Sequence, residues 1–135
     1  MCIRDRADII GLNIDMRNGH IDEHAGPTAT ADSTDQKLQW IRDEAGARFD
    51  QIELQVRIHL SMVTDDRRAV AEAVGPVLGL TPDQALESPH ALVGTEAEII
   101  DQLLERRDRF GISYIGLSVD AVDTMAPVVA KLAGT

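Results

Sequence analysis

The sequence is poor in cysteine, aromatic residues and long apolar runs, and two of these shortages exclude whole classes of protein. Cys2 is the only cysteine, so an intramolecular disulfide is impossible and a thiolate metal centre is excluded. This usage fits a reducing cytosol, and we expect a cytoplasmic protein. No apolar run reaches the ~20 residues that a membrane span needs. Met1–Arg6 lacks the apolar stretch of a signal peptide.

Charge and composition narrow the partners further. The 135 residues include 23 acidic and 13 basic side chains, which gives a formal net charge of -10. Such a field repels phosphate backbones and anionic lipid, so neither nucleic acid nor membrane is an expected partner. With 44% hydrophobic and 27% charged residues, the chain has the composition of one globular domain.

The start of the chain differs from the residues after it. Met1–Arg6 leads directly into Ala7–Ile10, which has the pattern of a buried strand, with no cap or lead-in between them. We interpret residues 1–6 as a non-native leader, with a short natural start as the alternative. Residues 7–135 are then the part that belongs to the domain.

Three segments have strand patterns. Asp8–Asn13 and Ser113–Val119 are short apolar runs, whereas Gln51–Val63 alternates strictly between apolar and polar residues. The apolar face of this long segment holds Ile52, Leu54, Val56, Ile58, Leu60 and Met62, and its polar face holds Glu53, Gln55, Arg57, His59 and Ser61.

Capping signals predict helices between and after these strands. The expected helices are Thr34–Ala45, opened by Ser33 and Gln36 and ended by Gly46; Asp65–Val74, capped by Thr64; a short turn opened by Thr81-Pro82; Glu96–Phe110, opened by Thr95 and Glu98 and ended by Gly111; and Ala121–Leu132, capped by Asp120. Asn18–Ser33, rich in Gly, Thr, Asp and Ala, is expected to be a long mobile loop.

Strands that alternate with helices indicate an α/β fold with parallel strands. Three strands alone would leave two open edges and a poorly covered face, so we expect an incomplete piece of a larger fold. The polar face of Gln51–Val63 favours a closed barrel, where one strand face meets helices and the other lines the lumen. The alternative is an edge strand with one face in water.

Two strings resemble the closing portion of the luciferase-like monooxygenase superfamily. Leu92–Leu103 (LVGTEAEIIDQL) has the family's VGT helix start, and Phe110–Ser118 (FGISYIGLS) has its FGI turn and last barrel strand. Ala7–Asn13 (ADIIGLN) resembles the sixth strand. The resemblance implies that residues 7–135 are the C-terminal part, about strands six to eight, of one TIM-type (β/α)8 barrel domain.

The resemblance is closest to the branch that uses the deazaflavin coenzyme F420. It implies a fragment of an oxidoreductase that transfers hydride between F420 and a small organic substrate, with a homodimer considered for the parent enzyme. An FMN-dependent monooxygenase of the same fold and a non-enzymatic α/β interaction module are the alternatives. The family's glycine-rich phosphate loop has no counterpart in these residues, so we expect the fragment alone to be inactive.

Four residues at strand ends are candidates for lining a substrate or coenzyme site, namely Asn13, Arg57, His59 and Ser118. Three of them also have a structural explanation: Asn13 suits a turn, Arg57 an ion pair with Glu53, and His59 a structural hydrogen bond. The catalytic residues stay unassigned.

Two further patterns are not taken as sites. His20 and His24 are four residues apart, but the glycines around them indicate a loop, so no metal site is predicted. Val93–Thr95 resembles a phosphate-binding helix start, but its capping box uses the free N–H groups. Asp120 is assigned to helix capping alone.

Overall fold

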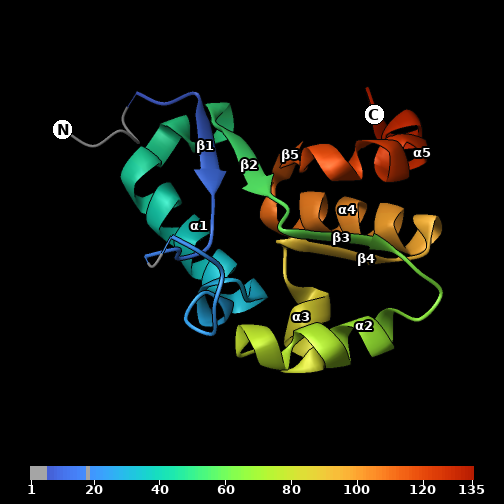
Figure 1. The fold of residues 1–135 in the computed structure, drawn as a ribbon. Coiled ribbons are helices and arrows are strands. Elements are labelled where there is room, and N and C mark those ends of the chain that lie inside the picture. Colours follow the sequence, from blue (N-terminus) through green and yellow to red (C-terminus); the bar gives the residue numbers. More distant parts are fainter. Residues whose placement is uncertain (1–5, 18) are drawn as a thin grey trace.

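The computed structural model of the chain describes residues 6–17 and 19–135, with strands and helices in alternation along most of its length (Figure 1). The strands are β1 (Ile9–Leu12), β2 (Glu53–Arg57), β3 (Leu60–Val63), β4 (Ala91–Gly94) and β5 (Ile112–Gly116). The helices are α1 (Ala31–Ala45), α2 (Arg67–Val74), α3 (Pro82–Glu87), α4 (Glu96–Phe110) and α5 (Val122–Leu132). Most of the segment interpreted as a leader, Met1–Asp5, lies outside the described residues, as does Asn18.

The strands form two small open sheets. In the larger sheet β2 lies between β1 and β5, and in the smaller one β3 pairs with β4. Leu54 of β2 aligns with Ile10 of β1 and with Ile112 of β5. Every pairing is parallel, which confirms the predicted α/β class with parallel strands.

The prediction of one continuous strand over Gln51–Val63 is wrong. The N–H of Ile58 donates to the Gly116 carbonyl at 2.8 Å, in the larger sheet, and the next N–H, of His59, donates to the His90 carbonyl at 2.8 Å, beside the smaller one. β2 and β3 therefore belong to different sheets. Because both are extended, the alternating sequence pattern runs on across the break, yet Met62 of the supposed apolar face is 41% exposed.

A fifth strand, β4, was not predicted. Its four residues are too few to show a periodic pattern, and Val93 and Gly94 were taken only as the approach to a helix. Beside β3, Leu92 of β4 is completely buried. The described chain therefore contains more short strands between its helices than the sequence predicts.

Helix α4 begins and ends as predicted. Thr95 Oγ1 accepts from the Glu98 N–H at 3.3 Å, and Glu98 Oε2 accepts from the Thr95 N–H at 2.8 Å, which completes the capping box. Gly111 ends the helix in the left-handed conformation, with φ of 72°. A second capping box joins Thr81 and Gln84 at the start of α3, where Pro82 is the first helical residue.

Three other helix starts differ from the predictions. Helix α1 is capped by Thr30, whose hydroxyl accepts from the Ser33 N–H, and α2 is capped by Asp66. A short 3-10 turn, Val119–Ala121, precedes α5, so Asp120 is not its N-cap. The starts of α1 and α2 lie in segments rich in Ser, Thr or Asp, where several side chains compete for the capping position, whereas the N-cap of α5 is Ala121, with no side-chain cap.

The main core lies between the larger sheet and helices α1, α4 and α5, all on one face of that sheet. Along β2, Leu54 and Val56 are buried against these helices, whereas Glu53 and Arg57 are exposed on the opposite face. The buried members of this core are Leu12, Ala31, Leu38, Ile41, Ile52, Leu54, Val56, Ile58, Leu92, Ile99, Phe110, Ile112, Ala121, Met125 and Val128.

Much of the segment expected to be a mobile loop is packed. Ala25 and Ala29 are buried with Ile14 in a small second cluster. A Cβ on Gly26 would lie 1.7 Å from the carbonyl oxygen of Leu78, so only glycine permits this close approach to the turn between α2 and α3. In Figure 1, α2 and α3 lie together below β4. Within residues 6–17 and 19–135, no helix combines the length and the apolar character of a membrane span.

Candidate functional site at the strand ends

The carboxyl ends of β1, β2 and β5 meet at one edge of the larger sheet. Asn13 directly follows β1, Arg57 ends β2, His59 is two positions further on, and Ser118 follows β5 at the same distance. Ligand sites in parallel α/β folds form at this edge. The structure therefore places all four predicted residues where such a site is expected.

Asn13 and His59 are in direct contact. Asn13 Oδ1 accepts a hydrogen bond from the Ile14 N–H at 2.9 Å and lies 2.8 Å from His59 Nε2. Because an amide oxygen can only accept, His59 carries its hydrogen on Nε2, and Nδ1 is the acceptor nitrogen. Burial, helped by the positive charge of Arg57, lowers the pKa of His59. The result is an oriented, neutral imidazole at the sheet edge.

Arg57, Ser118 and Asp120 form a second group at the same edge. The pKa of Asp120 lies below its ordinary value because the Ser118 side chain hydrogen-bonds its carboxylate, with a weaker attraction from Arg57. Arg57 thus acts electrostatically on both Asp120 and His59. The alternative ion pair between Arg57 and Glu53 is absent from the part of the chain that the structure describes.

Gln55 lies across the exposed face of the larger sheet. A Cβ on Gly11 would come within 2.8 Å of Gln55 Oε1, and one on Gly116 within 2.7 Å of Gln55 Nε2. The two glycines, one on each neighbouring strand, leave the space that this amide occupies. The amide is therefore closely fitted between its neighbours, on a face that also holds the exposed side chains of Ile9 and Tyr114.

Lys37 of α1 also belongs to the site, although it was not predicted from the sequence. Its Nζ donates to the carbonyl oxygens of Asn13, at 2.9 Å, and Thr28, at 2.6 Å, and burial lowers its pKa. The lysine thereby holds the end of β1 in place. Lys37 lies three residues after Thr34 and four before Ile41, so it is on the face of α1 that points toward the core. This helical spacing is the sequence signal that could have indicated a buried role for the lysine.

His90, just before β4, was also missed. It is 3% exposed, and its Nδ1 lies 2.9 Å from the Arg57 carbonyl oxygen, so the ring hydrogen is on Nδ1 and Nε2 is a bare acceptor. No residue in the described ranges gives Nε2 a hydrogen-bond partner. Burial lowers the pKa of His90 to about 4, which keeps the ring neutral near pH 7. In the sequence, the only indication that His90 belongs to a site is its position directly before the apolar run Ala91–Val93.

A pocket of about 180 Å³ lies beside this histidine. Its polar lining comes from His59, His90 and Ser88, whose hydroxyl donates to the Ala29 carbonyl at 2.6 Å. The rest is mainly apolar and includes Ile14, Leu60, Leu80 and Ala85. The pocket thus joins the Asn13–His59 pair to the segment before α1 and to the α2–α3 region.

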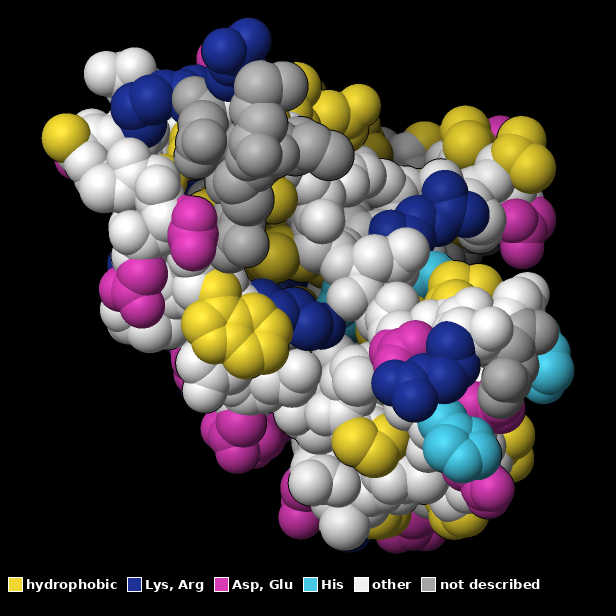
Figure 2. Space-filling view, turned by 90° about the vertical axis from the view of Figure 1, so that its left-hand side faces the viewer, with side chains coloured by type: hydrophobic (Ala, Val, Ile, Leu, Met, Phe, Trp, Pro, Cys, Tyr) yellow, Lys and Arg dark blue, Asp and Glu magenta, His cyan; other side chains and the backbone are white. Residues whose placement is uncertain are grey.

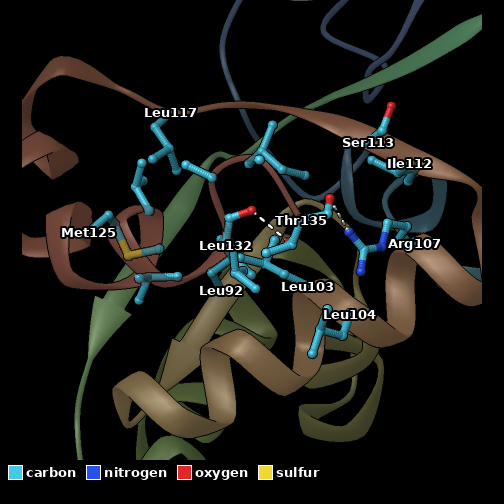
Figure 3. Close-up of a pocket in the computed structure, with 15 residues that line it drawn as sticks. Leu92, Leu103, Leu104, Arg107, Ile112, Ser113, Leu117, Met125, Leu132 and Thr135 are labelled. Carbon is cyan, nitrogen blue, oxygen red and sulfur yellow. Dashed lines mark hydrogen bonds between the residues drawn. The ribbon is translucent and has the colours of Figure 1, made fainter.

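A larger pocket of about 390 Å³ lies between α4, β5 and α5 (Figure 3). Figure 3 shows Leu92, Leu117, Met125 and Leu132 around it, with Arg107 and Thr135 together at one side. Arg107 donates to the Thr135 carbonyl at 3.0 Å. Among the described residues that line the pocket, Arg107 has the only ionisable side chain.

The face that carries α1 shows no broad area of one charge. Figure 2 shows hydrophobic, basic, acidic and histidine side chains interspersed across it. His20 and His24 both lie near Asp22, with nitrogen–oxygen distances of 3.7 and 3.4 Å. Among the described residues no three His, Cys, Asp or Glu side chains are grouped as metal ligands would be.

Comparisons of this chain with known protein families, with curated proteins and with solved structures find no match. The class of this protein is therefore defined by its fold and by the geometry of the candidate site alone. It is an α/β protein with parallel strands and a polar group of residues at their carboxyl ends.

Proposed function

We propose that the chain is the closing arc, strands six to eight, of a TIM-type (β/α)8 barrel of the luciferase-like class. The spatial order β1-β2-β5 follows the chain order, as it does for successive barrel strands. Helices α1 and α4 lie on the same face and are joined by an ion pair between Asp35 and Arg109 at 2.8 Å. Doubly wound sheets instead have helices on both faces, so the one-sided cover supports a barrel wall.

The open edges β1 and β5 support the idea that further strands complete the sheet. Each edge strand has one side without a strand partner in the described structure, and a parallel sheet with bare edges is rarely stable alone. In this proposal the remaining strands come from a longer parent chain. They would also supply the phosphate-binding loop that these residues lack.

The proposed activity is that of a cytoplasmic oxidoreductase acting on a small organic molecule. The observation that carries it is the neutral Asn13–His59 pair beside the cationic Arg57 at the carboxyl ends of adjacent parallel strands. Such hydrogen-bonding and cationic groups fit a carbonyl-rich, anionic ring system of the flavin or deazaflavin kind. The resemblance favours F420, with FMN as the alternative, and the bound coenzyme would supply hydride transfer.

In this site the chain's own residues bind and orient. Arg57 would balance negative charge on the coenzyme or substrate, and Asn13 would hold the His59 ring in one tautomer. Neutral His59 would present Nδ1 as an acceptor to a ligand N–H or O–H. Ser118 would anchor Asp120 beside this edge.

The test uses the reading frame extended upstream and the 135-residue chain side by side. We expect the extended protein to bind F420, seen as a change in its absorbance or fluorescence, and the 135-residue chain to show no turnover. In the extended protein, Arg57→Met should weaken binding about tenfold or more, whereas the control Arg107→Met should not. Tight binding and turnover by the short chain would contradict the fragment proposal, and binding of FMN alone would support the monooxygenase alternative.

The second candidate function is a non-enzymatic module that uses its open sheet edges to pair with itself or with another protein. Gel filtration with light scattering separates the two proposals. A cooperatively folding monomer or defined dimer of the 135-residue chain supports the module. A folded chain that self-associates through its open edges into oligomers of mixed size supports the fragment.

A further inference from the structure

We propose that the larger pocket, of about 390 Å³ between α4, β5 and α5, binds an apolar carboxylic acid with a body of fused rings and its carboxylate on Arg107. The three elements follow one another along the chain, so the pocket needs no further strand. Its lining includes none of the four residues predicted for the strand-end site. The inference therefore goes beyond the proposed function and does not depend on a coenzyme.

The body of the pocket is apolar and deep enough to bury rings. Leu92, Met125 and Val128, which line it, are all 2% exposed or less. Apolar cavities of roughly 150 Å³ admit a benzene-sized molecule, so a pocket of about 390 Å³ has room for two fused rings with a head group. Burial of such rings against these side chains would supply the hydrophobic part of the binding free energy.

The polar groups of the pocket are gathered at one side of it. In Figure 3, Leu117 and Met125 lie at one end, and Arg107 lies with Thr135 toward the other. A ligand with an apolar body and a single polar head group matches this division. The rings would then lie over the leucine and methionine side chains, and the head group would meet the guanidinium.

The state of Arg107 favours a carboxylate as the head group. Within the described chain its side chain makes one hydrogen bond, from Nη1 to the Thr135 carbonyl oxygen at 3.0 Å, and no ion pair. Its other N–H groups can donate to a ligand, and a guanidinium matches the two oxygens of a carboxylate. Although the chain has a net charge of -10, no described acidic side chain lines this pocket, so the local charge is positive.

Naphthoate and naphthamide are the matched probes, because they share the rings and have head groups of the same shape but different charge. With the full 135-residue chain, naphthoate should bind about fivefold more tightly than naphthamide and shift the Arg107 Nε–H resonance in NMR spectra. Without a usable cation the order reverses, because a carboxylate loses more hydration than an amide. Equal or tighter binding of naphthamide, as when Thr135 already neutralises the guanidinium, would overturn the proposal, as would no binding of naphthoate at millimolar concentration.

The variant Arg107→Met tests the head-group contact. It keeps an apolar side chain of similar reach and removes the charge. We expect naphthoate to bind it no better than naphthamide does, whereas naphthamide should bind as it does to the parent chain. A preference for naphthoate that persists in Arg107→Met would place the carboxylate elsewhere and contradict the proposal.

The variant Val129→Phe tests the location of the rings. Val129 lines the pocket but is 50% exposed, so a larger side chain can occupy the pocket without overfilling the core. Both probes should bind this variant about fivefold or more weakly. The control Val77→Phe makes the same change at a residue that is 70% exposed and lies outside the lining, and it should bind both probes as the parent chain does. Unchanged binding to Val129→Phe would refute the assignment to this pocket.

Discussion

The rings of His59 and His90 lie close together, with centroids 5.9 Å apart. The backbones of the two residues are also joined, because the backbone N–H of His59 donates to the backbone carbonyl oxygen of His90 at 2.8 Å. One nitrogen of each ring is fixed by an oxygen acceptor, Asn13 Oδ1 for His59 and the Arg57 carbonyl for His90. Burial lowers both pKa values, and the charge of a protonated His59 would lower that of His90 further. The native state therefore favours two neutral rings.

This pair makes stability depend on pH. Burial lowers the pKa of His90 from 6.5 to about 4, so the unfolded chain takes up a proton first as the pH falls. Its contribution to the free energy of unfolding is fully present above about pH 7 and is lost between pH 6.5 and about 4, on the order of 3 kcal/mol in total. Urea unfolding at a series of pH values measures this loss.

The variant His90→Asn isolates the contribution of this ring. Its amide N–H can still donate to the Arg57 carbonyl, but it does not titrate. We expect a flatter pH dependence than in the parent chain between pH 6.5 and 4. The control His24→Gln should follow the parent curve, and equal slopes for His90→Asn and the parent would refute the assignment.

Asn13→Asp should change the titration of His59. A carboxylate 2.8 Å from Nε2 would favour the protonated ring, so the His59 pKa should rise by about one unit or more above its lowered value. An NMR titration of the ring protons measures the shift, with His24 in the same spectrum as an internal control. An unchanged His59 pKa would show that the Asn13–His59 contact does not form in solution.

Arg106 holds the turn that carries His90. It is 5% exposed and donates to the carbonyl oxygens of Ser88, Pro89 and Ala91 at 2.6 to 3.3 Å. Arg106→Met would leave these buried acceptors without donors, and we expect a loss of about 3 kcal/mol in the free energy of unfolding. The neighbouring Arg107→Met removes only an exposed contact to Thr135 and should cost less than 1 kcal/mol in the same urea experiment.

Gly94→Ala tests the fit at the start of α4. Gly94 has φ of 142°, and a Cβ there would lie 2.7 Å from Glu98 Oε2, which belongs to the capping box. We expect a loss of about 2 kcal/mol from backbone strain and a displaced cap together. Gly46→Ala, at φ of 55° with open space around it, carries the strain alone and should cost about 1 kcal/mol. Equal Tm values for the two variants would count against the role of the cap.

The parts of the fold that could be predicted are those decided by neighbouring residues. Thr95 with Glu98, and Gly111 at the other end, mark α4 correctly because capping is a local interaction. The break after Ile58 could not be predicted, because it depends on which distant strand each backbone group meets. The alternation of side chains is the same on both sides of that break.

The same distinction between local patterns and long-range contacts applies to the candidate site. Asn13 and His59 were predicted from their places at strand ends, and the structure brings them together. Lys37 and His90 enter through contacts with residues more than 20 positions away, with Asn13 and with the Arg57 carbonyl. Such contacts have no counterpart in a local pattern, so the most buried polar group of the site stayed hidden in the sequence.

The change of sheets between Ile58 and His59 gives the chain two adjacent reporters of local opening. Their amide hydrogens are bonded to Gly116 and His90, next to different sheets, although the residues are consecutive. Amide hydrogen exchange measures the free energy needed to expose each one. Equal protection at the two positions would mean that both sheets open as one cooperative unit, whereas unequal protection would show which sheet detaches first.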